Sequence, residues 1–157
     1  MNARVSLTLN IYVDADACPV KEEVFRVAER HSIRVYLVSN NWYRGPENPL
    51  VHKVTVEKDP DAADDWIAEQ VISGDIVITS DIPLAARCIE KGAKALRPNG
   101  KLLSQDAIGM AIAMRDLSAH LRETGKITGG PAPFTRRDRS RFSDNLETTI
   151  QAAKRGK

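Results

Sequence analysis

The stretch Ile11-Tyr12-Val13-Asp14-Ala15-Asp16-Ala17-Cys18-Pro19 indicates how the chain folds. The apolar run from Leu7 to Val13 is typical of a buried strand, and two carboxylates and a proline end it abruptly. Because Pro19 has a fixed φ and no N–H, it suits the start of a helix. Asp14 and Asp16 are therefore expected at the carboxyl end of a strand, where open α/β sheets bind ligands. Two carboxylates this close repel each other unless a cation lies between them or one is protonated.

The length and the charge of the chain limit the function classes. It has 157 residues, enough for one domain with its own hydrophobic core. Its net charge of +2 is too small to indicate a polyanion-binding protein by itself. Residues 134–157 contain seven Lys or Arg and three Asp or Glu, a net charge of +4, which leaves −2 for the rest of the chain. An acidic body with a basic tail favours a phosphate-bearing partner, although a solvated helix end has the same composition.

Targeting signals and cysteine patterns are missing from the sequence. Cys18 and Cys88 match no disulfide or metal-binding pattern, and no stretch is typical of a signal peptide. The apolar run Leu7–Val13 is too short to span a membrane. We therefore expect a cytoplasmic protein with reduced thiols and no membrane segment.

Strand-like and helix-like segments alternate along the chain. This alternation predicts βαβ units and an α/β fold, in which a mostly parallel sheet of about five strands is covered on both faces. Strands are expected at residues 5–13, 33–38, 51–56, 76–79 and 93–96. Helices are expected at residues 19–30, from about 61 to 73, and at 82–91, 105–123 and 144–154.

Carboxylates follow or precede these strands at three places. Asp14 and Asp16 follow the first strand, a group of acids opens the second helix, and Asp81 follows the fourth strand. The helix group consists of Asp61, Asp64 and Asp65, which share one helix face because they are three and four residues apart. Carboxylate oxygens suit hard cations such as Mg²⁺ or Mn²⁺, and the sequence has no His/Cys cluster typical of zinc sites. Such an acidic pocket can activate water for attack at phosphorus.

Each acidic group also has a purely structural interpretation. Acids in the first turn of a helix are stabilised by the helix dipole without any function, and Asp81 can be an N-cap. Asp14 and Asp16 are harder to explain in this way, because Ser or Asn would serve equally well in a strand-end loop. The combination of the three groups is more specific than any one of them.

Several long motifs resemble a known family. The chain is similar to the YaiI/YqxD family of uncharacterised bacterial proteins over nearly its whole length, including Gly130-Pro131. The stretches that carry the resemblance are Val13-Asp14-Ala15-Asp16-Ala17-Cys18-Pro19-Val20, Asp61-Ala62-Ala63-Asp64-Asp65-Trp66-Ile67, Gly74-Asp75-Ile76-Val77-Ile78-Thr79-Ser80-Asp81-Ile82-Pro83-Leu84-Ala85 and Arg137-Asp138-Arg139-Ser140-Arg141-Phe142.

This family is in turn similar to PIN-like domains, many of which are metal-dependent ribonucleases. The resemblance implies a PIN-like three-layer sandwich over residues 1–128, followed by a Pro/Gly linker and a basic tail (129–157) packed on or near it. Asp14 matches the acid after the first strand, Asp65 or Asp64 the acid of the helix, and Thr79-Ser80-Asp81 the motif that ends the fourth strand. Many PIN nucleases also have a Glu after the second strand, where this chain offers only Glu47. Asp16 is a substitute, or the site is incomplete.

These observations predict a metal-dependent nuclease that uses Mg²⁺ or Mn²⁺ and acts on nucleic acid, with RNA expected. The residues expected in catalysis are Asp14, Asp16, Asp65 and Asp81, and the expected metal ligands are Asp14, Asp16, Asp64, Asp65 and Asp81. The residues expected to contact substrate are Asn40, Ser80, Arg137, Arg139 and Arg141. Trp42 and Tyr43 lie beside Asn40 and are able to stack on a base.

Two other functions fit the sequence. A haloacid-dehalogenase-like phosphatase would use Asp14 as nucleophile, Asp16 as acid/base and Ser39 to bind phosphate. That fold also requires a lysine and then an acidic motif at the end of a later strand. Here Asp75 precedes the fourth strand, and only Asp81 follows it. Alternatively, a PIN-like module binds nucleic acid or protein without catalysis, which the missing Glu favours.

Overall fold

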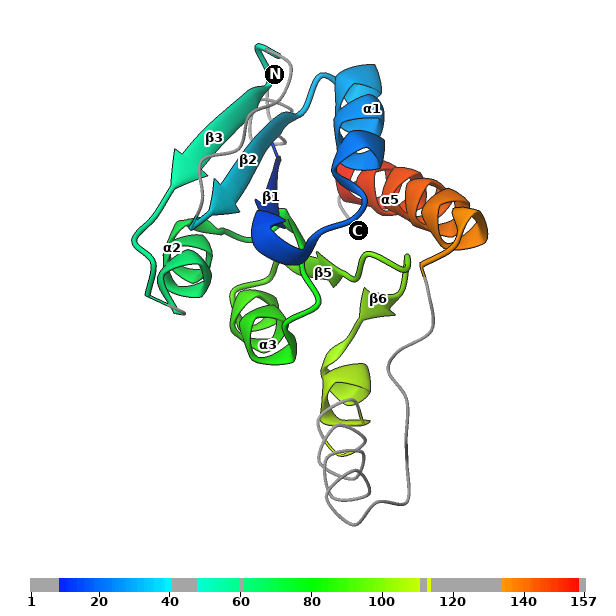
Figure 1. Cartoon of the computed structure of the whole chain (residues 1–157). Coiled ribbons are helices and arrows are strands. Elements are labelled where there is room, and N and C mark those ends of the chain that lie inside the picture. The colour runs from blue at the N-terminus through cyan, green and yellow to red at the C-terminus, as the bar shows by residue number, and fades with distance from the viewer. Residues whose placement is uncertain (1–8, 41–47, 60, 111–112, 114–133, 156–157) are drawn as a thin grey trace, which may run out of the picture.

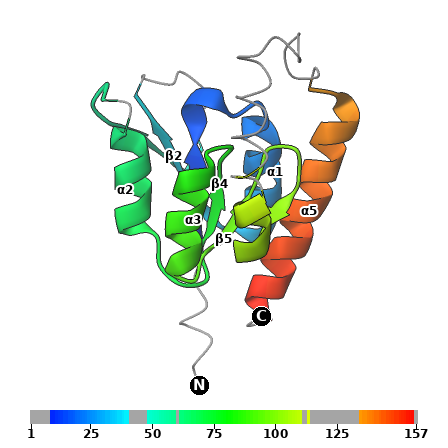
Figure 2. The ribbon, with the colours of Figure 1, turned by 90° about the horizontal axis from the view of Figure 1, so that it is seen from below.

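We describe the fold from a computed structural model. It describes residues 9–40, 48–59, 61–110, 113 and 134–155 (Figure 1). Helices cover both faces of a central sheet, which confirms the predicted α/β fold class. Figure 2 shows α2 (Ala62–Gln70) and α3 (Ile82–Glu90) on one side of the sheet and α1 (Lys21–His31) and α5 (Arg136–Lys154) on the other.

Within the described residues, the sheet has six strands in the order β3-β2-β1-β4-β5-β6. The first five are parallel to one another, and β6 runs antiparallel to β5. The strands are β1 (Asn10–Asp14), β2 (Arg34–Ser39), β3 (Val51–Thr55), β4 (Ile76–Ile78), β5 (Lys94–Leu96) and β6 (Leu102–Leu103). The sequence predicted the first five and missed β6, because two residues are too few to show a strand pattern.

β1 lies in the centre of the sheet and is buried on both faces. Ile11 and Val13 belong to the core that α1 and α5 cover. Tyr12 points to the other face, where it belongs to the core under α2 and α3 and stacks on Tyr36 with ring centroids 5.0 Å apart. The continuous apolar run of β1 therefore reflects two helix layers, as is usual for parallel strands.

The ends of three helices depend on local hydrogen bonds and on proline. α1 begins at Lys21 rather than at Pro19, because Val20 is the N-cap residue. α2 ends at Gln70 rather than near residue 73, since Val71 is extended and the Ile72 N–H donates to Asp75 (2.9 Å). α3 has proline in its first turn and an aspartate at its N-cap, as expected for a helix start.

α5 is longer than predicted. The sequence predicted a helix over residues 144–154, but α5 begins at Arg136. Thr135 and Asp138 form a capping box in which each side chain accepts from the other residue's backbone N–H, at 3.1 and 2.9 Å. Phe142 is fully buried and belongs to the core beneath α1. The arginine-rich stretch is therefore part of a packed helix.

Some predictions fall on residues outside the described ranges. They include the start of the first strand, most of the predicted helix 105–123, the linker at 129–133 and the domain boundary at 128–129. Residues 105–110 and 113 are helical. In the described part of the chain, no helix is long and apolar enough to cross a membrane.

Gly100 brings the turn between β5 and β6 against the backbone of α5. Its φ is +92°, and an added Cβ would lie 3.0 Å from backbone atoms of Arg141 and Phe142. Gly74 has a similar φ of +95° but has no atom within 4 Å of an added Cβ.

We predict that Gly100→Ala destabilises the fold more than Gly74→Ala does. Both variants incur a left-handed backbone penalty of about 1–2 kcal/mol, and only Gly100→Ala also displaces α5, at about 1–3 kcal/mol more. Urea denaturation followed by circular dichroism measures both. If both variants lost the same free energy of unfolding, the tight contact between this turn and α5 would be contradicted.

Candidate functional site

Three carboxylates lie together at the carboxyl edge of the sheet. Asp14 ends β1, Asp64 lies in the first turn of α2 and Asp81 is the N-cap of α3. All three are partly buried. The charges of Asp81 and Asp14 act on the carboxyl group of Asp64, and that of Asp81 acts on Asp14. We call these three residues the acidic cluster.

Thr79 joins two members of the acidic cluster. Its side chain is 1% exposed, and its hydroxyl donates to Oδ2 of Asp14 (2.9 Å). The same hydroxyl oxygen accepts the backbone N–H of Asp81 (3.0 Å). Asp81 in turn accepts the N–H of Leu84 (3.0 Å), so it caps α3 as one of its interpretations predicted. The orientation of Asp14 is therefore set by the end of the neighbouring strand.

The surroundings of the acidic cluster raise the pKa of two of its carboxyl groups, those of Asp14 and Asp64. Burial raises the pKa of Asp14, and the charges of Asp81 and Asp16 raise it further, while the hydrogen bond from Thr79 opposes this rise. The pKa of Asp64 rises to about 7 through burial, the charges of Asp81 and Asp14, and a hydrogen bond with Asp81. A perturbed pair of this kind is found at functional sites more often than elsewhere.

Asp16 lies beside the acidic cluster and binds the end of β2. Its carboxylate accepts the Ser39 hydroxyl (2.5 Å) and the backbone N–H of Asn40 (3.0 Å). The Asn40 side-chain amide donates to the carbonyl oxygen of Glu57 (2.9 Å). The same nitrogen lies 3.5 Å from the carbonyl oxygen of Asp59. Asp16 and Asn40 thus hold the segment that leads into α2, and through it Asp64.

Asp65 points to a different partner from its neighbour Asp64. It is exposed, and Arg87 of α3 donates to its carboxylate (2.9 Å). The sequence left open whether Asp64 or Asp65 matches the acid of the helix, and it is Asp64 that the structure brings to Asp14 and Asp81. Arg87 is a residue near the site that the sequence did not indicate, since the contact joins two helices.

Two further acids, Asp61 and Asp75, form no hydrogen bond with the acidic cluster among the described residues, although the charge of Asp61 raises the pKa of Asp64. Asp61 precedes α2, as predicted, but its side chain makes no capping hydrogen bond. Asp75 is buried, and its carboxylate accepts the N–H groups of Asn10 (3.0 Å) and Ile72 (2.9 Å). Because Asn10 is the first residue of β1, Asp75 stabilises the edge opposite to Asp14.

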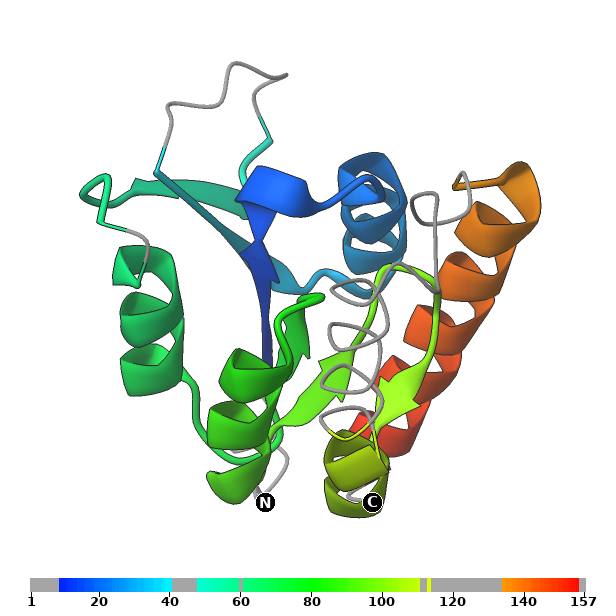
Figure 3. The same cartoon turned by 60° about the horizontal axis from the view of Figure 1, so that its bottom comes forward.

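The basic residues of α5 lie in different environments. Arg139 donates to the carbonyl of Pro19 (2.6 Å), lies 3.5 Å from Glu23 and stacks over Phe134. It therefore fastens α5 beside the start of α1, and Figure 3 shows this end of α5 at the edge where β1 ends. Arg137 and Arg141 are exposed, as is Ser80. Trp42, Tyr43 and Glu47 lie outside the described residues.

The donor set of the acidic cluster consists of carboxylate oxygens and the Thr79 hydroxyl. These hard oxygen donors suit Mg²⁺ or Mn²⁺ rather than zinc. As the side chains stand, no group of three or more His, Cys, Asp or Glu in the described residues is placed to hold a metal ion. Two features nevertheless favour cation binding. The donors are hard oxygen atoms, and the cluster has excess negative charge, which a proton on Asp64 offsets.

The fold and this site define an α/β protein with an acidic cluster at the carboxyl edge of its sheet. A family model described as "Uncharacterized BCR, YaiI/YqxD family" matches residues 12–152. The chain therefore belongs to the YaiI/YqxD family.

Close relatives support this assignment. A UPF0178 protein of Rhodospirillum rubrum is 56% identical over 150 residues, which cover 95% of this chain and 100% of the relative. A UPF0178 protein of Parvibaculum lavamentivorans is 59% identical over 145 residues, covering 92% of this chain and 95% of the relative. No solved structure matches the chain.

The raised pKa of Asp64 predicts a stability that falls as pH rises. In the unfolded chain, Asp64 ionises as the pH rises through its usual pKa of 3.8, whereas in the folded chain it keeps the proton up to about pH 7. The contribution of Asp64 to the free energy of unfolding is thus fully present below pH 3.8 and is lost as the pH rises to about 7. Asp64→Asn should therefore gain stability relative to wild type from pH 5 to pH 8, by an amount on the order of 1 kcal/mol after solvent screening.

Urea unfolding at pH 5, 6, 7 and 8 measures this difference. Asp65→Asn is the matched control, because it removes an adjacent acid whose partner is Arg87. A pH profile of Asp64→Asn parallel to that of wild type would show that Asp64 ionises normally.

Proposed function

We propose that this protein is a divalent-metal-dependent phosphodiesterase of PIN-like type that cleaves nucleic acid, with RNA as the expected substrate. The proximity of Asp14, Asp64 and Asp81 at the carboxyl edge is the observation that carries this proposal. Burial, together with their mutual repulsion, raises the pKa of Asp64 to about 7, and this repulsion favours a cation that displaces the proton.

Asp14, Asp64 and Asp81 would hold Mg²⁺ or Mn²⁺ after their side chains turn toward the ion, because as they stand they are not placed to bind it. When bound, the ion would polarise a phosphoryl oxygen and promote ionisation of water at neutral pH. Thr79 fixes the Asp14 carboxylate from the side of β4, so that this ligand needs no rotamer search on binding. Asp16 would act through Ser39 and Asn40 by positioning the segment that carries Asp64.

Asp65 and Arg87 would have a role at the border of the site. Their ion pair joins α2 to α3 next to Asp64. Both side chains are about half exposed, with 46% for Arg87 and 55% for Asp65, so the pair can open at low cost. Arg87 would then be available to a phosphate of the substrate, for which a guanidinium is well suited.

A non-catalytic nucleic-acid- or protein-binding module is the second candidate. The hydrogen bond between Asp64 and Asp81 favours it, because a proton shared by two carboxyl groups neutralises part of the cluster without any ion. The lack of a ready-made group of metal ligands in the described residues is consistent with the same function. Metal binding distinguishes the two candidates.

We predict that the wild type binds Mn²⁺ and that Asp14→Asn and Asp81→Asn each weaken binding at least tenfold, because each removes an anionic ligand. Isothermal titration calorimetry at pH 6.5 measures the affinity. Repeating it in buffers of different ionisation enthalpy counts released protons, and we expect up to one, from Asp64. Asp65→Asn is the control and should bind within a few-fold of wild type.

Cleavage of a labelled single-stranded RNA with Mn²⁺ then tests the activity. Loss of cleavage in Asp14→Asn, with a wild-type circular dichroism spectrum, would support the nuclease. A wild type that binds no Mn²⁺, even with an oligonucleotide present, would favour the binding module. Trapping of the wild type by a phosphate-mimicking fluoride would instead indicate the phosphatase with Asp14 as nucleophile.

A further inference from the structure

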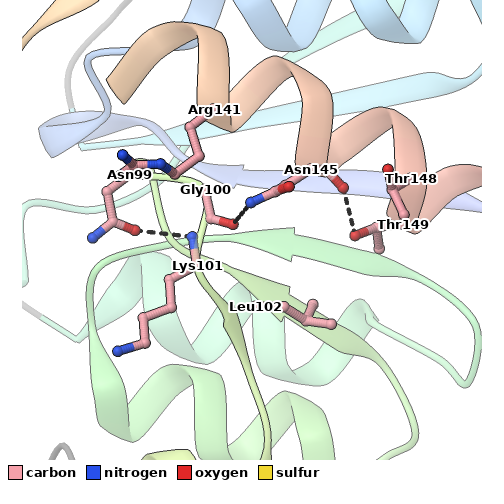
Figure 4. Close-up of a pocket in the computed structure, with 8 residues that line it drawn as sticks. All are labelled: Asn99, Gly100, Lys101, Leu102, Arg141, Asn145, Thr148 and Thr149. Atoms are coloured by element: carbon pink, nitrogen blue, oxygen red, sulfur yellow. Dashed lines mark hydrogen bonds between the residues drawn. The ribbon is translucent and has the colours of Figure 1, made fainter. Parts of the chain in front are cut away.

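A hollow of about 650 Å³ lies between the β5–β6 turn and α5. Figure 4 shows the turn on one side and the face of the helix on the other. The residues that line it are polar or basic except for Gly100 and Leu102, and none of them is acidic. We call it the β5–β6 hollow; its polar lining residues are Asn99, Lys101, Arg141, Asn145, Thr148 and Thr149.

The walls of the β5–β6 hollow are held together by backbone contacts. Gly100 approaches the α5 backbone closely, and its carbonyl accepts a hydrogen bond from the Asn145 side chain. The Asn99 side chain accepts the N–H of Lys101 (2.9 Å), which closes the turn. The turn is therefore fixed to the helix, and the hollow exists before any ligand binds.

The β5–β6 hollow carries two positive charges with little compensation. Lys101 is exposed, and its ammonium group has no hydrogen bond or ion pair with any described residue. In the described part of the chain, the acid that pairs with Arg141 is Asp138, at 3.7 Å, and the pair is weak because the Arg141 side chain is exposed. Two exposed cations beside the side-chain amides of Asn99 and Asn145 favour a phosphate group as the ligand.

The β5–β6 hollow lies at the same edge of the sheet as the acidic cluster. Its turn begins where β5 ends, and the N–H of Thr79 donates to Leu96, the last residue of β5 (3.2 Å). β5 is two strands from β1, and neighbouring strands are about 5 Å apart, so their ends are separated by roughly 10 Å. A polymer that places one phosphate at the acidic cluster can therefore reach the hollow with another.

We propose that the β5–β6 hollow binds a non-scissile backbone phosphate of a single-stranded nucleic acid through Lys101 and Arg141. The proposal rests on the proposed function for the identity of the polymer, and it defines the substrate as a chain longer than a mononucleotide. Arg139 has no part in this contact, because Pro19 and Glu23 already bind it.

The test is the affinity for a fluorescein-labelled single-stranded RNA of ten nucleotides, measured by anisotropy in EDTA at several salt concentrations. The variant is Lys101→Gln/Arg141→Gln. Its control is Arg34→Gln/Arg155→Gln, which removes the same charge at the start of β2 and the end of α5, away from the hollow. We expect the variant to bind roughly tenfold more weakly and to reduce the salt slope by about 1, with the control near wild type.

Two outcomes would overturn the proposal. Equal losses in the variant and the control would mean a general charge effect. A wild type that does not bind the RNA, or that binds a mononucleotide as tightly as the ten-nucleotide chain, would exclude a polymer phosphate in the hollow. The Mn²⁺ titration tests the proposed function separately. If the protein binds no Mn²⁺ but its RNA affinity still depends on Lys101 and Arg141, the nuclease proposal fails and the proposal for the β5–β6 hollow stands.

Discussion

The parallel pairing of β1 with both of its neighbours is the constraint on which the rest of the structure depends. β1 pairs with β2 so that Asp14 lies opposite Val38, and with β4 so that Val13 lies opposite Ile78. Because all three strands point the same way, the residues that follow them must emerge at one edge. Thr79 and Asp81 therefore meet Asp14 as a consequence of strand register, and the helix that starts at the same edge adds Asp64.

That register has an electrostatic cost. Partly buried carboxylates repel one another, and the fold offsets this with the Thr79 hydroxyl at Asp14, the backbone N–H of Leu84 at Asp81 and a proton on Asp64. Hydrophobic residues at these positions would avoid the repulsion altogether. A site that needs a proton to balance its charge at neutral pH is also one that gains most from a bound cation, because the cation replaces the proton and interacts with every member of the cluster.

Sequence patterns predicted the parts of this structure that depend on local order and missed those that depend on contacts across the chain. The apolar run ending in Asp14 and Asp16 predicted a buried strand with acids at its carboxyl end. The choice between Asp64 and Asp65 required the structure, since consecutive helix residues point about 100° apart and an uncertain helix start leaves the face undetermined. The first turns of α5 were missed because their many charges hid the capping box of Thr135 and Asp138.

The docking of α5 changes how its basic charge acts. A loose basic tail would attract phosphate only over long range and would lose conformational entropy on binding. In this fold, Arg139 and Phe142 hold the helix against α1, and Gly100 holds it against the β5–β6 turn. Arg141 thereby lies on one wall of the β5–β6 hollow and Lys101 on the turn that forms the other, so one helix supplies both a core face and a basic residue of the hollow. The acidic body and the basic tail seen in the sequence thus become two neighbouring regions of a single edge, which we propose to bind a cation and a phosphate respectively.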